Sequence, residues 1–226
     1  MARVRSEVRA FTTVDQRIAE QTIGRLSLYR RLLDTLMRDC VEHVYSHQLA
    51  EKTGFTSAQV RRDLMAVDAA GNTRRGYDVG ELIRAIDDYL YAPSGQQVAV
   101  VGIGNLGRAL LTFFSGRRPK LSVVAGFDVD EQVVDRVIHG CRVYHMDEVD
   151  RVVAEDEITL VMLTVPSDAA QPAADACIAA GVSGILNFAP ARLKVPPSVY
   201  VSHVDLTMYL EMVAFFARQK DGDQGD

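Results

Sequence analysis

The chain has 226 residues, of which 48% are hydrophobic and 24% are charged, and its formal net charge is −5. This is the composition of an ordinary globular protein that can bury a core, and the length suits one large or two small domains. No apolar run approaches the length of a membrane-spanning helix and the first residues show no secretory signal, so we expect a cytoplasmic protein.

The three cysteines, Cys40, Cys141 and Cys177, are odd in number and widely spaced. Their spacing matches no metal site, so no metal is expected. They favour a reducing compartment over disulfide formation. We interpret them as small buried hydrophobic side chains without a redox role.

The charge is unevenly distributed along the chain. The first ninety residues carry 14 basic and 13 acidic side chains, whereas the remainder carries 11 and 17. A local cluster of basic residues lies between Lys52 and Tyr77. A basic patch on an acidic chain is compatible with nucleic-acid binding on one face, although charge alone does not establish it.

The first ninety residues are predicted to form a compact helical domain. Residues 1–16 have mixed charge and no clear period, so we expect a mobile N-terminal extension there. Ser46 is the predicted N-cap of a short helix that ends before Gly54, and a capping box at Thr56 to Gln59 opens the next helix. The four expected helices span residues 17–39, 46–53, 56–69 and 79–91.

The second and third of these helices are spaced as a helix-turn-helix. Ala50 permits close helix contact, Gly54 makes the turn and Val60 anchors the second helix, which would enter the major groove. The basic segment 72–77 would then form a wing that touches the DNA backbone or minor groove. The candidate DNA-binding residues are Ser57, Gln59, Arg61, Arg62, Arg74, Arg75 and Tyr77. A plain helical bundle with solvated arginines is the alternative.

A linker at Pro93 to Gly95 leads into a segment in which strands and helices alternate. Apolar strands such as 158–163 indicate a parallel sheet buried on both faces. The expected strands are 97–101, 121–127, 141–144, 158–163, 183–187 and 199–201, and the expected helices are 105–114, 131–138 and 167–180. A final helix at 205–219 is apolar on most of its circumference, which favours a dimer interface.

A glycine motif marks the start of this second domain. The strand ending at Val101 is followed by Gly102, Gly104 and Gly107, in the order strand, glycine loop, helix that dinucleotide-binding domains require. The phosphates would lie on the positive N-terminus of that helix. Asp128 ends the next strand and would accept hydrogen bonds from the adenosine ribose, with Asp130 as the second candidate; a carboxylate there favours NAD(H) over NADP(H).

The second domain lacks the proton donor or base that hydride-transfer enzymes need beside the nicotinamide. None of the five histidines lies in a catalytic signature, and His203 is the best of them. Thr164 to Pro166 and Asn187 to Pro190 follow predicted strands, where ligands bind in open parallel sheets. A nucleotide site without catalytic groups suggests a sensor.

Several segments together resemble the Rex family of NAD(H)-responsive transcriptional repressors. The resemblance covers residues 17–218 in order. It rests on Arg25 to Tyr29, Val60 to Leu64, Gly102 to Gly107, Phe127 to Asp128, Leu163 to Pro166, Gly184 to Pro190 and Val204 to Leu206.

The resemblance implies a homodimer. Each subunit would have an N-terminal winged helix-turn-helix domain, here 17–92, and a C-terminal Rossmann domain, here 96–202. A terminal helix, here 203–220, would be domain-swapped and followed by a disordered tail at 221–226. Rex proteins bind palindromic double-stranded operator DNA when free or bound to NAD⁺, and release it when NADH binds.

The resemblance also implies roles for particular residues. Arg25 would pair with Asp205 at the start of the swapped helix, as a charge-assisted switch between two domain orientations. Phe113 replaces a tyrosine that usually bonds that aspartate, and the wing also departs from the family pattern. The implied cofactor-binding residues are Gly102, Ile103, Gly104, Asn105, Leu106, Gly107, Phe113, Asp128, Thr164, Val165, Pro166, Asn187, Phe188 and Asp205.

Two other functions remain open at this point. One is a small NAD-dependent dehydrogenase with a helical appendage. The other is a DNA-binding regulator that senses another nucleotide such as CoA, because related Rossmann domains bind coenzyme A.

Overall fold

The computed structural model describes residues 20–72, 74–114, 116 and 120–222, without the side chains of 219–222. The chain divides into two compact units, Met1–Pro93 and Ser94–Asp226. The predicted mobile extension at 1–16 lies outside the described residues. The beginning of the first predicted helix, 17–19, and the last four residues of the predicted tail, 223–226, also lie outside them.

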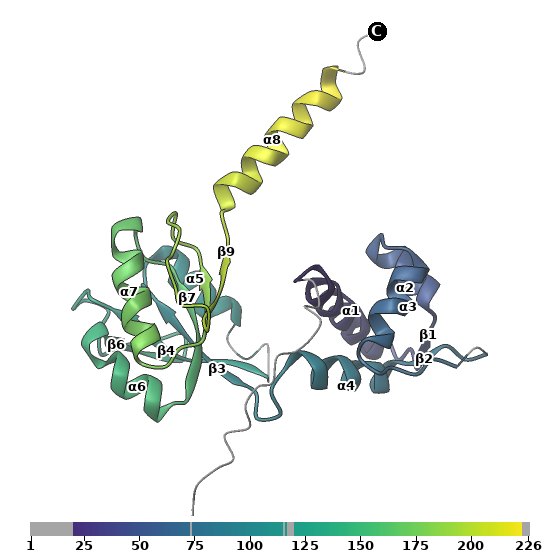
Figure 1. The fold of residues 1–226 in the computed structure, drawn as a ribbon, viewed down its shortest axis with the longest axis horizontal. Coiled ribbons are helices and arrows are strands. Elements are labelled where there is room, and N and C mark those ends of the chain that lie inside the picture. The colour runs from purple at the N-terminus through teal and green to yellow at the C-terminus, as the bar shows by residue number, and fades with distance from the viewer. Residues whose placement is uncertain (1–19, 73, 115, 117–119, 223–226) are drawn as a thin grey trace, which may run out of the picture. The chain divides into compact units, whose positions relative to one another are not determined.

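The described part of the N-terminal unit contains four helices and a two-stranded antiparallel sheet (Figure 1). They are α1 (Glu20–Arg38), β1 (His43–Val44), α2 (Ser46–Thr53), α3 (Ser57–Met65), β2 (Tyr77–Asp78) and α4 (Val79–Leu90). The core of this unit is built from apolar side chains at helical spacing, among them Leu26, Leu33, Leu49 and Ile86, which are fully buried. All four predicted helices are therefore present.

The turn between α2 and α3 has the predicted chemistry. Gly54 adopts a left-handed backbone with φ 76°, and its N–H donates to the carbonyl of Ala50. The Thr56 hydroxyl accepts the backbone N–H of Gln59 at 3.2 Å and caps α3. Val60 is completely buried beneath it.

Two predicted helix ends are wrong. Ser46 is the first residue of α2 and not its cap: the Gln48 side chain instead accepts the N–H of Tyr45, at 2.8 Å. The third helix ends at Met65, short of Ala69, because Asp68 has a positive φ of 53° that no helix continues through.

A buried ion pair joins α1 to α3. Nε and Nη2 of Arg25 donate to the two carboxylate oxygens of Asp63, each at 2.7 Å, and the Tyr29 hydroxyl donates to the same carboxylate at 3.0 Å. Asp63 is only 3% exposed. The bond to Asp63 raises the pKa of Arg25, while burial and then the bond to Asp63 raise the pKa of Tyr29. The network therefore holds a charged arginine and a neutral tyrosine at physiological pH.

The C-terminal unit is a seven-stranded sheet in the order β5-β6-β4-β3-β7-β8-β9. All neighbours are parallel except β5 and β6. The strands are β3 (Gln96–Val101), β4 (Leu121–Asp128), β5 (Val137–Ile138), β6 (Cys141–His145), β7 (Ile158–Leu163), β8 (Gly184–Asn187) and β9 (Tyr200–His203). The chain builds outward from β3 in both directions, as in a Rossmann fold, so the predicted fold class is confirmed.

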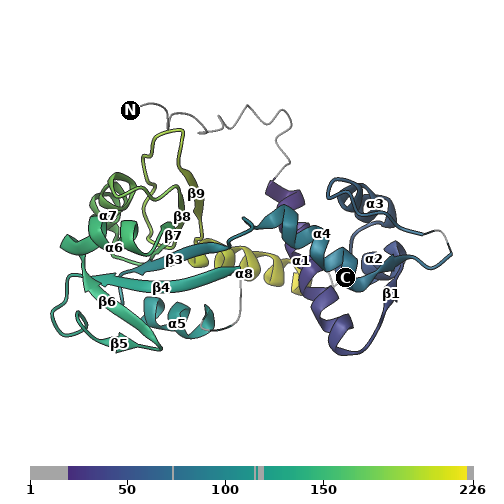
Figure 2. The same ribbon diagram turned by 90° about the horizontal axis from the view of Figure 1, so that it is seen from below.

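Helices cover both faces of this sheet. α6 (Val149–Glu155) and α7 (Ser167–Ala179) pack on one face, and α5 (Asn105–Phe114) packs on the other (Figure 2). Burial on both faces explains why most of β7 and the last four residues of β3 are apolar.

The segment 131–138 is not the predicted helix. Residues 131–135 form turns and Val137–Ile138 form β5, which pairs with β6 across a tight turn at His139 and Gly140, both with positive φ. Backbone bonds from Asp135 to Val143 and from Val143 to Arg136 extend the pairing, so contact with β6 overrides the local helical pattern. The structure also adds α6, for which no helix was predicted.

The cysteine prediction holds for two of the three residues. Cys141 and Cys177 are buried, and burial raises the pKa of their thiols to about 11 and about 12. Cys40 is exposed at the end of α1, so the expectation of burial is wrong there.

The last helix, α8, spans Leu206–Gly222, two residues into the predicted tail. Its N-terminus is capped by Asp205, whose carboxylate accepts the N–H of Met208 at 2.9 Å. Eight large apolar side chains on α8 are 45–69% exposed: Leu206, Met208, Tyr209, Leu210, Met212, Val213, Phe215 and Phe216. Such a surface is unusual for a monomer and marks an interaction site. Across the described residues, no helix is both long and apolar enough to cross a membrane.

The buried ion pair leads to a stability prediction. Asp63→Asn leaves the partly buried Arg25 without its counter-charge, and we expect the free energy of unfolding to fall by about 2 kcal/mol. Urea denaturation of the full chain, followed by circular dichroism, measures this.

Asp39→Asn is the matched control, because it removes a carboxylate that is exposed at the end of α1. Equal stability of the two variants would mean that the Arg25–Asp63 pair contributes nothing.

Candidate functional site

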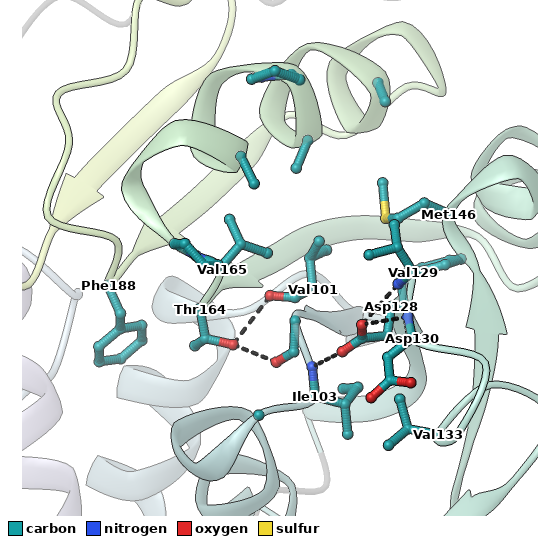
Figure 3. Close-up of a pocket in the computed structure, with 18 of the residues that line it drawn as sticks. Val101, Ile103, Asp128, Val129, Asp130, Val133, Met146, Thr164, Val165 and Phe188 are labelled. Atoms are coloured by element: carbon teal, nitrogen blue, oxygen red, sulfur yellow. Dashed lines mark hydrogen bonds between the residues drawn. The ribbon is translucent and has the colours of Figure 1, made fainter.

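A cleft of about 1060 Å³ opens at the carboxyl ends of β3, β4 and β7 and at the start of α5. These are the strands at which the chain reverses its direction of travel across the sheet, which is where open α/β sheets bind ligands. Its volume is that of a site for a large organic ligand. Figure 3 shows the residues that surround it, with the glycine loop on one side and Phe188 on another.

The strands on both sides of β3 hold the glycine loop in place. Gly102 has φ 91°, and its N–H donates to the carbonyl of Phe127 on β4 at 2.8 Å. From the other side, the Thr164 hydroxyl donates to the carbonyls of Gly102 and Val101, at 2.6 and 3.1 Å (Figure 3). A Cβ at Gly102 would meet the backbone of Thr164 at 3.0 Å, so the turn requires glycine.

The two later glycines have different surroundings. A Cβ at Gly107 would lie 2.0 Å from the carbonyl oxygen of Gly102, so glycine is required there for the helix to approach the loop. A Cβ at Gly104 would meet nothing within 4 Å. Gly104 therefore leaves open space in front of the N-terminus of α5, which is where a dinucleotide fold receives the pyrophosphate.

Asp128, at the end of β4, is fixed beside this loop. Its carboxylate accepts the N–H of Ile103 at 2.5 Å, of Val129 at 2.7 Å and of Asp130 at 3.0 Å. Asp130 and Asp147 also line the cleft. Three carboxylates along one side disfavour an additional phosphate group on the ribose, in line with the predicted preference for NAD(H).

Asn187 lies at the opposite wall but does not line the cleft. It is 1% exposed, and its amide nitrogen donates to the carbonyls of Ala189 and Ala191, at 3.3 and 2.8 Å, while its oxygen accepts the N–H of Ala189. The same nitrogen lies 3.0 Å from Nδ1 of His203. Asn187 thus shapes the loop that presents Phe188.

Nine of the predicted cofactor-binding residues line one cleft: Gly102, Ile103, Gly104, Asn105, Asp128, Thr164, Val165, Pro166 and Phe188. Five others lie outside its lining: Leu106, Gly107, Phe113, Asn187 and Asp205. Phe113 is 54% exposed and stacks edge-on against Phe114. The structure therefore supports the nine cleft residues as parts of a ligand site within one chain. It places the other five outside that site.

The sequence interpretation missed part of the lining. Arg108, Val133, Met146 and Asp147 were not predicted, nor were four small residues of α7 at helical spacing: Ala169, Pro172, Ala173 and Ala176. The run of small residues along a predicted helix was the available signal, since such a face leaves room for a ligand.

The predicted DNA-binding residues of the N-terminal unit share α3 and the wing. Arg61, Arg62, Arg74 and Arg75 are exposed, and Ser57 and Gln59 are half-buried near the start of α3. Nη1 of Arg61 donates to the hydroxyl of Ser46, the first residue of α2, at 3.3 Å. Exposed arginines on such a helix can reach base edges or phosphates.

The wing is held by packing and backbone bonds. Asn72 and Gly76 form a β-bridge, and the Tyr45 hydroxyl donates to the carbonyl of Arg74 at 2.7 Å. Tyr77 is half-buried with its ring against Gly71, where a Cβ would lie 2.7 Å away. Tyr77 therefore supports the wing from within.

The predicted switch residues each have a partner within their own unit. Arg25 is bound to Asp63, and Asp205 caps α8. A bond between Arg25 and the Asp205 of a second chain stays a prediction.

Comparisons with known proteins agree with both units. Residues 17–64 match the family "Putative DNA-binding protein N-terminus", and residues 94–191 match the family "CoA binding domain". The Redox-sensing transcriptional repressor Rex of Staphylococcus haemolyticus is 36% identical over 89% of this chain and 95% of its own length. The repressor of the same name from Streptococcus uberis is 39% identical over 91% and 98%.

The chain belongs to the Rex family of redox-sensing transcriptional repressors. A solved structure of RSP, a Rex-family repressor, in complex with beta-NAD⁺ and operator DNA is similar with a TM-score of 0.83. Its sequence is 29% identical, and the match covers 92% of this chain and 95% of that one. RSP in complex with beta-NADH is similar with a TM-score of 0.79. The predicted family, the DNA-binding N-terminal domain and the Rossmann domain are thereby confirmed.

The two glycines of the loop should respond differently to the same change. Gly107→Ala forces α5 away from the loop because of the clash with Gly102, and we expect a loss of roughly 2–4 kcal/mol in the free energy of unfolding. Gly104→Ala should leave that free energy nearly unchanged, since its Cβ points into open space. Thermal melting of the two full-length variants compares them, and equal melting temperatures would contradict the assigned packing role of Gly107.

Proposed function

We propose that this chain is a transcriptional repressor that senses the NADH/NAD⁺ ratio. It binds operator DNA when free or bound to NAD⁺, and it releases the operator when NADH binds. The observation that carries this proposal is that one chain combines a helix-turn-helix bearing exposed arginines with a glycine-loop cleft at the switch point of a Rossmann sheet. The RSP complexes with NAD⁺ and operator DNA and with NADH support it.

The proposed role of the nucleotide is that of a signal. The described residues that line the cleft include no histidine, lysine, tyrosine or cysteine; their acid–base groups are three aspartates, of which Asp128 is bonded to three backbone N–H groups. His203, the best histidine by sequence, lies against the Asn187 amide. These features support a regulator over a dehydrogenase. We propose that the protein acts in the cytoplasm, where operator DNA and NAD(H) are both available to it.

A dimer follows from the surface of α8. Its exposed apolar side chains need cover that its own chain does not give them, and we propose that α8 is exchanged with a second copy. A palindromic operator would then match the two-fold symmetry of the protein.

CoA is the second candidate for the ligand. The match of residues 94–191 to the family "CoA binding domain" favours testing it, because CoA also contains an adenosine diphosphate. Calorimetry with NADH, NAD⁺, NADPH and CoA separates the candidates. Tight binding of NADPH would also contradict the role given to Asp128.

NADH should release the protein from DNA. We expect the apo and NAD⁺-bound chain to retard an operator selected from random-sequence DNA, and NADH to abolish the shift. Gly104→Val fills the space in front of α5, so this variant should bind the operator but lose its response to NADH. Binding that NADH does not affect in the wild-type chain would contradict the sensor function, and retained NADH affinity in Gly104→Val would contradict the loop assignment.

Arg61 tests the proposed DNA-reading helix. Arg61→Ala should weaken operator binding by about 1–3 kcal/mol if the guanidinium contacts a base. Fluorescence anisotropy with operator and with random DNA measures the change. Arg84→Ala, on α4, removes the same charge outside α3 and the wing. Unchanged operator affinity in Arg61→Ala would shift base reading to Gln59 or Arg62.

The proposed switch joins Arg25 to the partner subunit's Asp205. In this structure Arg25 uses Nε and Nη2 for Asp63, so a second carboxylate would bind the remaining nitrogen of the guanidinium. A double-mutant cycle of Arg25→Ala and Asp205→Ala on operator affinity should give a coupling energy above about 0.5 kcal/mol. Arg31, which is exposed on the same helix, is the control: a second cycle pairs Arg31→Ala with Asp205→Ala. Coupling of Asp205 to Arg31 in place of Arg25 would contradict the assignment.

A further inference from the structure

Arg108 is the basic side chain of the nucleotide cleft. It lies on the first turn of α5 and lines the cleft, and the other charged side chains among the described lining residues are Asp128, Asp130 and Asp147. The lining therefore presents one cation and three carboxylates. A pyrophosphate carries two negative charges, so without a strong local cation this field would oppose it.

The guanidinium of Arg108 is held against the glycine loop. Its Nε donates to the carbonyl of Ile103 at 3.0 Å, and its backbone N–H donates to the carbonyl of Gly104, also at 3.0 Å. The side-chain bond uses Nε, and the two terminal nitrogens form the fork that binds phosphate oxygens in pairs. Because the loop already fixes the guanidinium, less side-chain entropy is lost when a ligand binds.

Arg108 also lies on the side of the helix that is open. It follows Gly104 by four positions, and residues with this spacing share one face of a helix. That is the face on which a Cβ at position 104 would meet nothing within 4 Å. The backbone there offers the partial positive charge of a helix N-terminus, about half an elementary charge, which by itself does not balance a pyrophosphate.

We propose that Arg108 is the counter-ion that binds the pyrophosphate of the dinucleotide and offsets the three carboxylates of the cleft. This inference rests on the proposed function, because it assigns a residue to the ligand named there. It assigns different parts of the cofactor to different residues: Asp128 binds the adenosine ribose, and Arg108 binds the pyrophosphate.

The test compares Arg108→Ala, Arg108→Lys and a matched control in the full-length protein. Arg136→Ala is the control, since Arg136 is exposed and outside the cleft lining. Calorimetry with NADH, ADP-ribose and adenosine separates the phosphates from the adenosine, and NADPH is measured alongside them to probe the ribose 2′ position. Arg108→Ala should raise the dissociation constants of NADH and ADP-ribose by about 10-fold or more, and that of adenosine not at all.

Three further results are expected. Arg108→Lys should recover part of the affinity, because lysine keeps the charge but not the paired donors. Circular dichroism should show all variants folded, and Arg108→Lys serves as the test variant if Arg108→Ala is not. The loss should also shrink at high salt, as screening weakens the pair.

Three results would overturn the inference while leaving the proposed function intact. They are wild-type NADH affinity in Arg108→Ala, an equal loss for adenosine, and a loss confined to NADPH, which would place the guanidinium at the ribose 2′ position. A folded wild-type chain that binds neither NADH nor NAD⁺ would instead refute the proposed function, and the role of Arg108 with it.

Discussion

The nucleotide cleft depends on how closely the start of α5 approaches the end of β3. Glycine at position 107 permits this approach, because any Cβ would collide with the carbonyl oxygen of Gly102. The loop between them is then held from both sides, by the backbone of β4 and the hydroxyl of Thr164. With Asp128 bonded to the N–H of Ile103, the loop is shaped before any ligand arrives. A preformed cradle lowers the ordering cost of binding, which suits a sensor that must respond to a ratio of two similar ligands.

Much of the fold could be predicted because its signals are local. Strands β3 and β7 are apolar runs buried on both faces, and the glycine loop follows directly on β3. The error at 131–138 has a non-local cause, since β5 exists only through its pairing with β6. Its valines and isoleucine fit a strand as well as a helix, and the turn at His139 and Gly140 decides between them. The missed helix α6 has its buried valines at helical spacing, so a closer application of periodicity would have found it.

The candidate site was predictable in part for the same reason. Residues in short motifs at strand ends converge on the cleft, because parallel strands bring their carboxyl ends to one edge. The sequence could not distinguish side chains that hold a loop in shape from side chains that face the ligand. Asn187, which bonds its own loop, is an example. Arg25 is a second example. Its partner Asp63 occupies the buried stripe of α3 together with Val60 and Leu64, and that spacing was the signal for an internal ion pair.

The two units share one electrostatic feature: in each, an acidic side chain beside the anion site is bonded by the protein itself. An acidic protein with two anionic ligands cannot rely on its overall field, which salt screens within about 8 Å, so groups in direct contact decide binding. Asp63 directly follows Arg61 and Arg62 in the sequence, and an exposed carboxylate there would repel phosphates. Its burial against Arg25 removes that charge from the surface while the two arginines stay exposed. In the cleft, Asp128 is likewise bonded to three backbone N–H groups while Arg108 lines the open side. In each unit one acidic side chain next to the anion site, Asp63 or Asp128, is bonded by the protein itself, and arginines present the positive charge that an anion meets.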